Sequence, residues 1–308
     1  MNQIFRAMGC TVQVQVECAA PDRAAAGWFA DWEACLSRFR SDSELARLNR
    51  RPGRLVPVSA TLWDVLQTAL EAAAWSDGLV VPTVLGAMCS AGYDRSFELL
   101  AARSASPGPA PAHLTVGDWR TISTIAHGRR VRCQGNLDLG GVAKGWAADT
   151  AAARLARSGP ALVDAGGDIA VNGPRADGAG WPIGVPHPLD MQRQITLIWL
   201  AGGGVATSGI DHRRWRRDGR EMHHIIDPRT GRPARSDVVS ATVIGPSAAD
   251  AEVAAKCALI LGSAAGIAWL DERPLLAGLV VRADGSVVES RRFAEYRWPA
   301  AVAVGAQA

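Results

Sequence analysis

Short segments with the alternating pattern of a β-strand recur along this chain between helical segments, without the regular period of about 30 residues that repeated βαβ units produce. The clearest of them is residues 11–17 (TVQVQVE), in which Val12, Val14 and Val16 would share one buried face. Strands and helices that alternate irregularly are typical of α+β domains. We therefore predict the α+β class.

Helical spacing of apolar residues predicts further elements. One helix should begin at residues 21–22 and run through Leu36, a second should begin after Ser59 as its N-cap, and two more are expected over residues 141–156 and 248–261. Further strands are expected near residues 121–125, 130–133, 161–164, 169–172, 194–200, 238–244 and 277–281. The whole chain, residues 1–308, is expected to form a single domain, with an exposed loop in the Pro/Ala/Ser-rich stretch near residues 103–112.

The composition is that of an ordinary globular protein, with 48% hydrophobic and 20% charged residues. No apolar run approaches the roughly 20 residues of a membrane-spanning helix, so no membrane span is expected. A net charge of +3 is too small to argue for a nucleic-acid partner. The first residues lack the charged and apolar regions of an export signal, and six cysteines without a CxxC pair fit free thiols, so we expect a cytoplasmic protein.

Lysine is rare in this chain. Of 33 basic residues only Lys144 and Lys256 are lysines, and the others are arginines. An ammonium group is a compact point charge that the planar guanidinium group of arginine does not reproduce. These two positions are therefore candidates for a specific role.

Three glycine-containing segments could carry chemistry. Residues 138–145 (DLGGVAKG) lead into a helix, where glycines, a helix N-terminus and Lys144 could together bind an anion, although a tight turn explains the segment equally well. Residues 164–173 (DAGGDIAVNG) favour a sharp turn between two short strands. Residues 202–209 (GGGVATSG) could bind phosphate through hydroxyl and amide groups, or could simply begin a hairpin.

Three further segments hold ionisable side chains. His224 ends an expected strand within residues 223–233 (HHIIDPRTGRP), and a lone histidine in such a place is more often structural. The arginine-rich segment before it also contains acidic residues, which favours a solvated hairpin tip. Glu252 and Lys256 lie one turn apart on the last expected helix, where a surface ion pair is the simplest interpretation.

In this order, the segments resemble the ApbE family, the FAD:protein FMN transferases. The resemblance begins with residues 7–17 (AMGCTVQVQVE) and 36–49 (LSRFRSDSELARLN), and it continues through DLGGVAKG, the GGD turn, the TSG segment, HIIDPRTGRP and the helix ending in ALILG. It spans nearly the whole chain. It implies an α+β fold around a T-fold-like core, with mixed sheets and packed helices.

Members of that family bind FAD and a magnesium ion, transfer the FMN half of FAD to a threonine hydroxyl of a partner protein, and release AMP. The resemblance therefore implies a transferase whose partner is an acceptor flavoprotein with a target threonine. An FAD-binding module without transfer activity and an FAD pyrophosphatase that uses water as the nucleophile remain open. A serine hydrolase using Ser208 and His224 is a more distant alternative, because ATSGI lacks the G-x-S-x-G elbow.

The resemblance also implies roles for individual residues. His224 matches the proposed general base, and Gly141 and Glu252 match positions that bind the metal, Gly141 through its carbonyl. The implied cofactor-binding residues are Met8, Phe39, Leu79, Val80, Val81, Asp138, Lys144, Thr207, Ser208, Ile226 and Lys256.

The chain departs from the family pattern at two places. The family's Asp-x-Thr triplet reads Val81-Pro82-Thr83 here, which removes a carboxylate. Glu252 and Lys256 stand where the family has a metal-binding Asp and Thr, and an ammonium group cannot ligate magnesium, which requires oxygen donors. Lys256 could instead place its charge on the pyrophosphate of FAD, or Asp250 could act as the ligand if the helix register differed by two residues.

Overall fold

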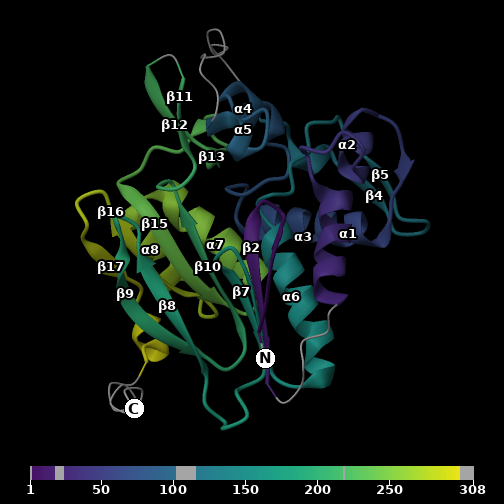
Figure 1. Cartoon of the computed structure of the whole chain (residues 1–308). Coiled ribbons are helices and arrows are strands. Elements are labelled where there is room, and N and C mark those ends of the chain that lie inside the picture. Colours follow the sequence, from purple (N-terminus) through teal and green to yellow (C-terminus); the bar gives the residue numbers. More distant parts are fainter. Residues whose placement is uncertain (1, 18–23, 102–115, 218, 299–308) are drawn as a thin grey trace.

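The computed structural model describes residues 2–17, 24–101, 116–217 and 219–298. The loop predicted near residues 103–112 and the helix start predicted at residues 21–22 lie outside the described residues. A large sheet of eight antiparallel strands dominates the fold (Figure 1). In spatial order its strands are β1 (Asn2–Ala7), β2 (Cys10–Val16), β6 (Ala161–Ala165), β7 (Asp168–Asn172), β10 (Gly203–Gly209), β15 (Val238–Gly245), β16 (Ala277–Arg282) and β17 (Val287–Glu289).

Helices cover one face of this sheet. They are α6 (Ala143–Leu155), α7 (Ala248–Leu261) and α8 (Ser263–Asp271). Most residues of α7 are buried, as expected for a helix that is largely apolar and lies between the sheet and its neighbours. The prediction of an α+β fold is confirmed, and the helix expected over residues 248–261 has those bounds.

A long hairpin covers the other face. It is formed by β8 (Trp181–His187) and β9 (Asp190–Leu200). Trp181, Ile183 and Val185 pack in one buried cluster with Ile244 and Leu279 of the large sheet. The fold therefore has three layers, because both faces of the sheet are apolar and each needs a cover.

A second group of elements lies beside α6. Its members are α1 (Ala24–Leu36), α2 (Glu44–Asn49), α3 (Ala60–Trp75) and a small sheet of β3 (Val56–Pro57), β5 (Arg130–Arg132) and β4 (Ser123–Ile125). As predicted, Ser59 caps α3, and its hydroxyl accepts a hydrogen bond from the Leu62 amide at 3.2 Å.

Short elements gather at one end of the large sheet, at the top of Figure 1. They are α4 (Leu85–Ser90), α5 (Phe97–Ala101), the hairpin β11 (Arg214–Arg217) to β12 (Arg220–His223), and β13 (Ile226–Asp227) paired with β14 (Arg232–Pro233). Single turns of 3₁₀-helix complete the described chain: η1 (Trp119–Thr121), η2 (Ala156–Ser158) and η3 (Phe293–Tyr296). A cluster including Met88, Tyr93, Leu100 and Ile226 holds α4, α5 and β13 together.

Two turns bring backbone toward this end. Ala7 pairs with Cys10, which leaves Met8 and Gly9 as a two-residue turn with φ of +51° and +68°. A type I′ hairpin turn requires both of its central residues to be in the left-handed region. Met8 is thereby placed at the tip of the hairpin. The strand β1 was not predicted, whereas the predicted turn at Gly166 and Gly167 is confirmed, with φ of +69° and +91°.

The segment of residues 202–209, expected either to bind phosphate or to begin a hairpin, contains the central strand β10 (Gly203–Gly209). A Cβ atom on Gly204 would lie 2.1 Å from the Ala248 nitrogen, so the glycine allows the strand to pass directly under the start of α7. Thr207 faces Thr242 of the neighbouring strand, with 2.9 Å between their hydroxyl oxygens, and Ser208 is buried. Gly204 therefore serves helix–strand packing.

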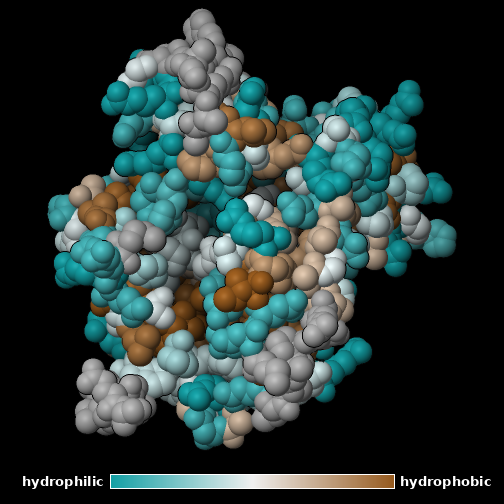
Figure 2. Space-filling view, viewed as in Figure 1, coloured by the Kyte–Doolittle hydropathy of each residue, from teal (hydrophilic) through white to brown (hydrophobic). Residues whose placement is uncertain are grey.

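Figure 2 shows hydrophilic residues spread over one face, with apolar residues in smaller groups. Within the described ranges, no helix combines the length and apolar character that crossing a membrane requires. The five cysteines that lie in those ranges are free thiols, as predicted.

Candidate active site

A cavity of about 440 Å³ opens where the β1–β2 turn, the start of α6, the middle of α7 and the β12–β13 connection meet. Its volume is in the range of small-molecule sites. The residues predicted from sequence that line it are Met8, Phe39, Leu79, Val80, Val81, Asp138, Gly141, Lys144, His224, Ile226 and Lys256. Segments that are distant in sequence therefore converge on one site.

Three predicted residues do not line the cavity. Thr207 and Ser208 lie in β10, where their neighbours are other strands, so the prediction that they contact the cofactor is not supported by their position. Glu252 lies behind the cavity wall with a side chain only 1% exposed.

One side of the cavity is aromatic. The Arg38 guanidinium carbon lies 4.1 Å from the Phe39 ring centroid and 4.5 Å from the Tyr93 centroid, and Arg38 also donates a hydrogen bond to the Tyr93 carbonyl at 2.9 Å. The Phe39 and Tyr93 centroids are 5.6 Å apart. Together with Leu79, Val80 and other apolar side chains, these rings provide a surface on which a planar ligand can stack.

Asp138 is already paired. Its carboxylate lies 2.7 Å from Arg38 Nε, with both side chains less than 8% exposed, and it accepts a hydrogen bond from the Gly140 amide at 2.8 Å. A buried pair of this geometry holds the loop before α6 in place. Sequence reasoning missed Arg38, although it stands directly beside Phe39 in the RFR segment.

The opposite side of the cavity contains both lysines of the chain. Lys256 Nζ lies 2.9 Å from Glu252 Oε1, and Lys144 Nζ lies 3.7 Å from the same oxygen. Lys144 also forms an ion pair with Asp168. The second Glu252 oxygen accepts a hydrogen bond from the Gly145 amide at 2.9 Å.

Burial separates the two kinds of charge in this cluster. The carboxylate side chains of Glu252 and Asp168 are 1% and 2% exposed, whereas those of Lys256 and Lys144 are 16% and 20% exposed and line the cavity. Burial alone would raise the pKa of Glu252, but the ammonium groups of Lys256 and Lys144 lower it below its ordinary value. Burial lowers the pKa of Lys144, partly opposed by the Glu252 charge.

Gly145 brings the two helices of this cluster together. A Cβ atom at this position would lie 2.6 Å from Ala249 Cα and 2.7 Å from the Ala248 carbonyl. Only glycine therefore allows α6 to approach α7 closely enough for the Gly145 amide to reach Glu252. The last glycine of DLGGVAKG thus has a packing role.

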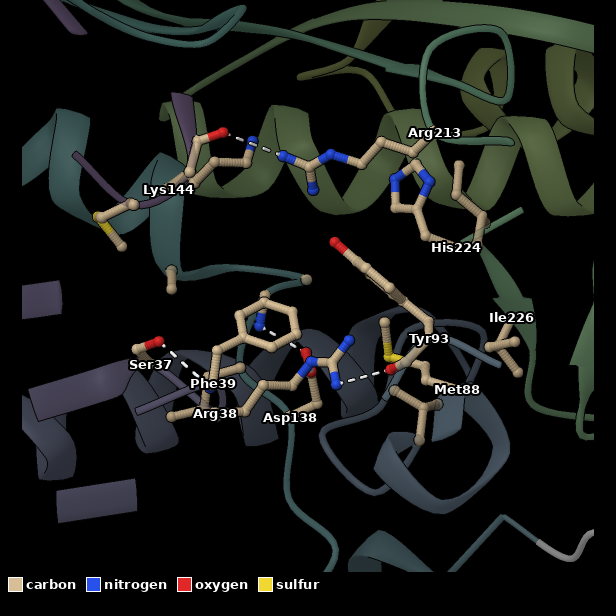
Figure 3. Close-up of a pocket in the computed structure, with 18 of the residues that line it drawn as sticks. Ser37, Arg38, Phe39, Met88, Tyr93, Asp138, Lys144, Arg213, His224 and Ile226 are labelled. Carbon is tan, nitrogen blue, oxygen red and sulfur yellow. Dashed lines mark hydrogen bonds and ion pairs between the residues drawn. The ribbon is translucent and has the colours of Figure 1, made fainter. Parts of the chain in front are cut away.

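His224 projects into the cavity from the short connection between β12 and β13 (Figure 3). Its Nδ1 atom is buried and has no hydrogen-bond partner among the residues that the structure describes. Burial, followed by the charges of Arg213 and Lys256, lowers the pKa of His224 well below 6.5, so the ring is neutral. His223 has a different environment, with Nε2 2.9 Å from the Ala234 carbonyl, and it does not line the cavity.

Sequence reasoning missed three further residues of the site. Tyr93 and Arg213 line the cavity, and Asp168 holds Lys144 from behind. Figure 3 shows Lys144 and Arg213 on one side of the cavity, and Phe39, Arg38 and Asp138 on the other. Tyr93 is one of only two tyrosines in the chain, which was an available signal, whereas Arg213 was assigned with its neighbours to a solvated hairpin tip.

The magnesium ligands predicted from the sequence are the Gly141 carbonyl, at a residue that lines the cavity, and the Glu252 carboxylate. Both Glu252 oxygens are engaged, one by two ammonium groups and one by an amide. The described part of the chain holds no cluster of three His, Cys, Asp or Glu side chains that could bind a metal ion. Asp250, the alternative ligand, lies in the first turn of α7, accepts a hydrogen bond from Ser247 and does not line the cavity. The donor set therefore does not fit Mg²⁺.

Comparison with known proteins adds a family context. A model described as the ApbE family matches residues 8–280, a span that includes every residue lining the cavity. The chain is 33% identical over 295 residues to an FAD:protein FMN transferase of Treponema pallidum (strain Nichols), covering 86% of this chain and 80% of that protein. It is 30% identical over 270 residues to an FAD:protein FMN transferase of Escherichia coli (strain K12), covering 82% and 71%.

Solved structures share the fold. The ApbE protein of Thermotoga maritima matches with a TM-score of 0.84 at 27% identity, covering 97% of this chain and 99% of that one. The flavin transferase ApbE of Vibrio cholerae matches with a TM-score of 0.77 at 25% identity, covering 96% and 98%. The similarity therefore extends through all the layers described above.

Proposed function

The chain belongs to the ApbE family, and on this basis we propose that it transfers the FMN half of FAD to a threonine hydroxyl of an acceptor protein and releases AMP. The observation that carries the proposal is the cavity itself. One side offers aromatic and apolar surface for a flavin, and the other offers ammonium and guanidinium groups for a pyrophosphate. A dinucleotide such as FAD has both chemical features in one molecule.

The reaction is a phosphoryl-type transfer. The threonine oxygen attacks the phosphorus atom on the riboflavin side of the pyrophosphate, and a new P–O bond forms. The bond between that phosphorus and the bridging oxygen breaks, and AMP leaves with the bridging oxygen. Catalysis of this kind depends on positioning the groups and neutralising the phosphate charge, which are tasks for the cavity's cations.

His224 is our candidate for the general base. Its imidazole is neutral and lines the cavity, so it can accept the proton that the threonine hydroxyl loses. The free Nδ1 atom supports this role, because a buried polar atom without a partner is costly unless the site uses it.

Phe39, Met8 and the segment of Leu79, Val80 and Val81 are proposed to contact the flavin ring system, with Ile226 beside them. Asp138 is proposed to act mainly through Arg38, since the two form a buried pair. The predicted magnesium ion has no fitting donor set here, so no step of the proposed reaction is assigned to a metal.

Mass spectrometry of an acceptor protein tests the proposal. The chain is incubated with FAD and an acceptor that presents a threonine, with and without added magnesium. Transfer predicts an increase equal to FMN minus one water, which disappears when the threonine is replaced by valine. Free FMN and AMP without an adduct would support the pyrophosphatase alternative, and intact bound FAD would support a module without transfer activity.

That the acceptor is a flavoprotein with a target threonine is part of this proposal. The cytoplasmic location stays a prediction from the sequence.

A further inference from the structure

We propose that Lys256, supported by Lys144, takes the place of a divalent cation, so that this chain binds the pyrophosphate group of its dinucleotide substrate without a metal. The inference rests on the proposed function, because it concerns how that substrate is held. It follows from the convergence of the chain's only two lysines on one carboxylate oxygen, Glu252 Oε1.

The Glu252 carboxylate is not available to a metal ion. Mg²⁺ requires oxygen ligands at about 2.0–2.1 Å in octahedral geometry. Glu252 Oε1 already has the Lys256 ammonium group at 2.9 Å and the Lys144 ammonium group at 3.7 Å. A dication could reach this oxygen only by displacing Lys256 and then remaining close to two like charges.

The charges of this cluster are arranged with the carboxylates behind the cations. Glu252 and Asp168 lie behind the wall and compensate for the two lysines, whose side chains line the cavity. Arg213 adds a third cation to the lining, and its Nη2 atom lies 3.5 Å from the Gly9 carbonyl. This side of the cavity therefore presents positive groups to a ligand, as a pyrophosphate requires.

Lysine is an exceptional residue at these two positions. Arginine is the ordinary basic residue of this chain, yet lysine occupies both of these positions. A compact ammonium group carries its charge as a point, with three donors, and so resembles a small cation more closely than a guanidinium group does. Lys256 is 16% exposed, which lets its side chain contact both Glu252 behind it and a ligand in the cavity.

The test measures FAD binding by equilibrium dialysis, separately in chelator and in millimolar magnesium, with the metal content of the purified protein determined in parallel. The proteins are the unmodified chain, Lys256→Thr and Lys256→Gln. Arg157→Thr, an exposed position outside the cavity, controls for the loss of one positive charge. Circular dichroism establishes that each variant is folded.

The unmodified chain should contain no stoichiometric magnesium, and its dissociation constant for FAD should differ by less than about twofold between the two buffers. Lys256→Thr and Lys256→Gln should bind FAD about tenfold more weakly in chelator, because a charge-assisted contact to phosphate is lost. Lys256→Thr, with a hydroxyl ligand, should recover affinity when magnesium is added. Arg157→Thr should behave as the unmodified chain does.

If the unmodified chain binds FAD tightly only with magnesium, this inference is overturned and the proposed function stands. If both Lys256 variants bind FAD as the unmodified chain does in chelator, Lys256 has no role at the pyrophosphate. If the unmodified chain binds FAD in neither buffer, both the inference and the proposed function are overturned. The comparison of buffers for the unmodified chain needs no variant to fold.

Discussion

The ring of Tyr93 lies edge-on to the imidazole of His224, with 6.5 Å between the ring centroids and 74° between the ring planes. Tyr93 follows α4 in the first half of the chain, and His224 follows β12 in the second. Tyr93 packs in turn against Phe39 and Trp215, with centroids 5.6 Å and 5.4 Å away. These aromatic contacts hold the imidazole at the boundary between the aromatic side of the cavity and its cationic side.

Replacement of His224 by alanine should slow the transfer step and leave FAD binding nearly unchanged. We expect His224→Ala to keep its FAD affinity within a few-fold and to slow transfer by about 10²–10⁴, the usual contribution of a general base. His223→Ala is the matched control, because His223 faces the Ala234 carbonyl instead of the cavity. Single-turnover transfer rates and FAD titrations measure both quantities. A His224→Ala protein that retains full transfer activity would remove this residue from the mechanism.

The pH dependence of transfer should reflect the environment of His224. Burial and the nearby cations Arg213, Lys256 and Lys144 hold its pKa well below 6.5, so the neutral, proton-accepting form persists as the pH falls through 6.5. We therefore expect the acid limb of kcat/KM to lie well below pH 6.5. Arg213→Ala removes one of the cations and should move that limb to higher pH. A limb that stays unchanged in Arg213→Ala and His224→Gln would contradict the assignment.

The preference for FAD over FMN should reflect the presence of a cationic side of the cavity opposite its aromatic side. FMN offers the flavin and one phosphate, whereas FAD adds a second phosphate for the cations. We expect FAD to bind at least about tenfold more tightly than FMN, which corresponds to one charge-assisted contact of about 1.4 kcal/mol. Fluorescence titration with each flavin measures the ratio, and Lys256→Ala should reduce it. Equal affinities for FAD and FMN would show that the cationic side does not bind the pyrophosphate.

Gly145 should be intolerant of a side chain. Gly145→Ala places a methyl group 2.6 Å from Ala249 Cα, so α6 and α7 must separate, and we expect a loss of about 1–3 kcal/mol in the free energy of unfolding. Gly27→Ala in α1 is the matched control, because nothing lies within 4 Å of its added methyl group. That control should be neutral or stabilising by up to about 1 kcal/mol, since alanine favours a helix. Thermal unfolding of both variants measures the difference, and equal melting temperatures would contradict the close packing.

Interactions between residues close together in the sequence were enough to predict several elements of this protein. The alternation of Val12, Val14 and Val16 predicts β2, because one face of a strand repeats every second residue. The capping serine Ser59 marks the start of α3 because its side chain satisfies an amide that has no partner inside the helix. The sequence also predicts the pairing of Glu252 with Lys256, because residues four apart lie on the same face of a helix.

The tertiary structure decided what those local features do. Gly204 permits a strand beneath α7 and not a phosphate loop, because the start of that helix occupies the space above it. Sequence spacing predicts a surface ion pair for Glu252, but the sheet and α6 bury it and bring Lys144 to the same oxygen. Tyr93 and Arg213 join the site only through packing between segments far apart in the chain. Periodicity and capping act over a few residues, whereas burial and the meeting of charges depend on which distant segments the fold brings together.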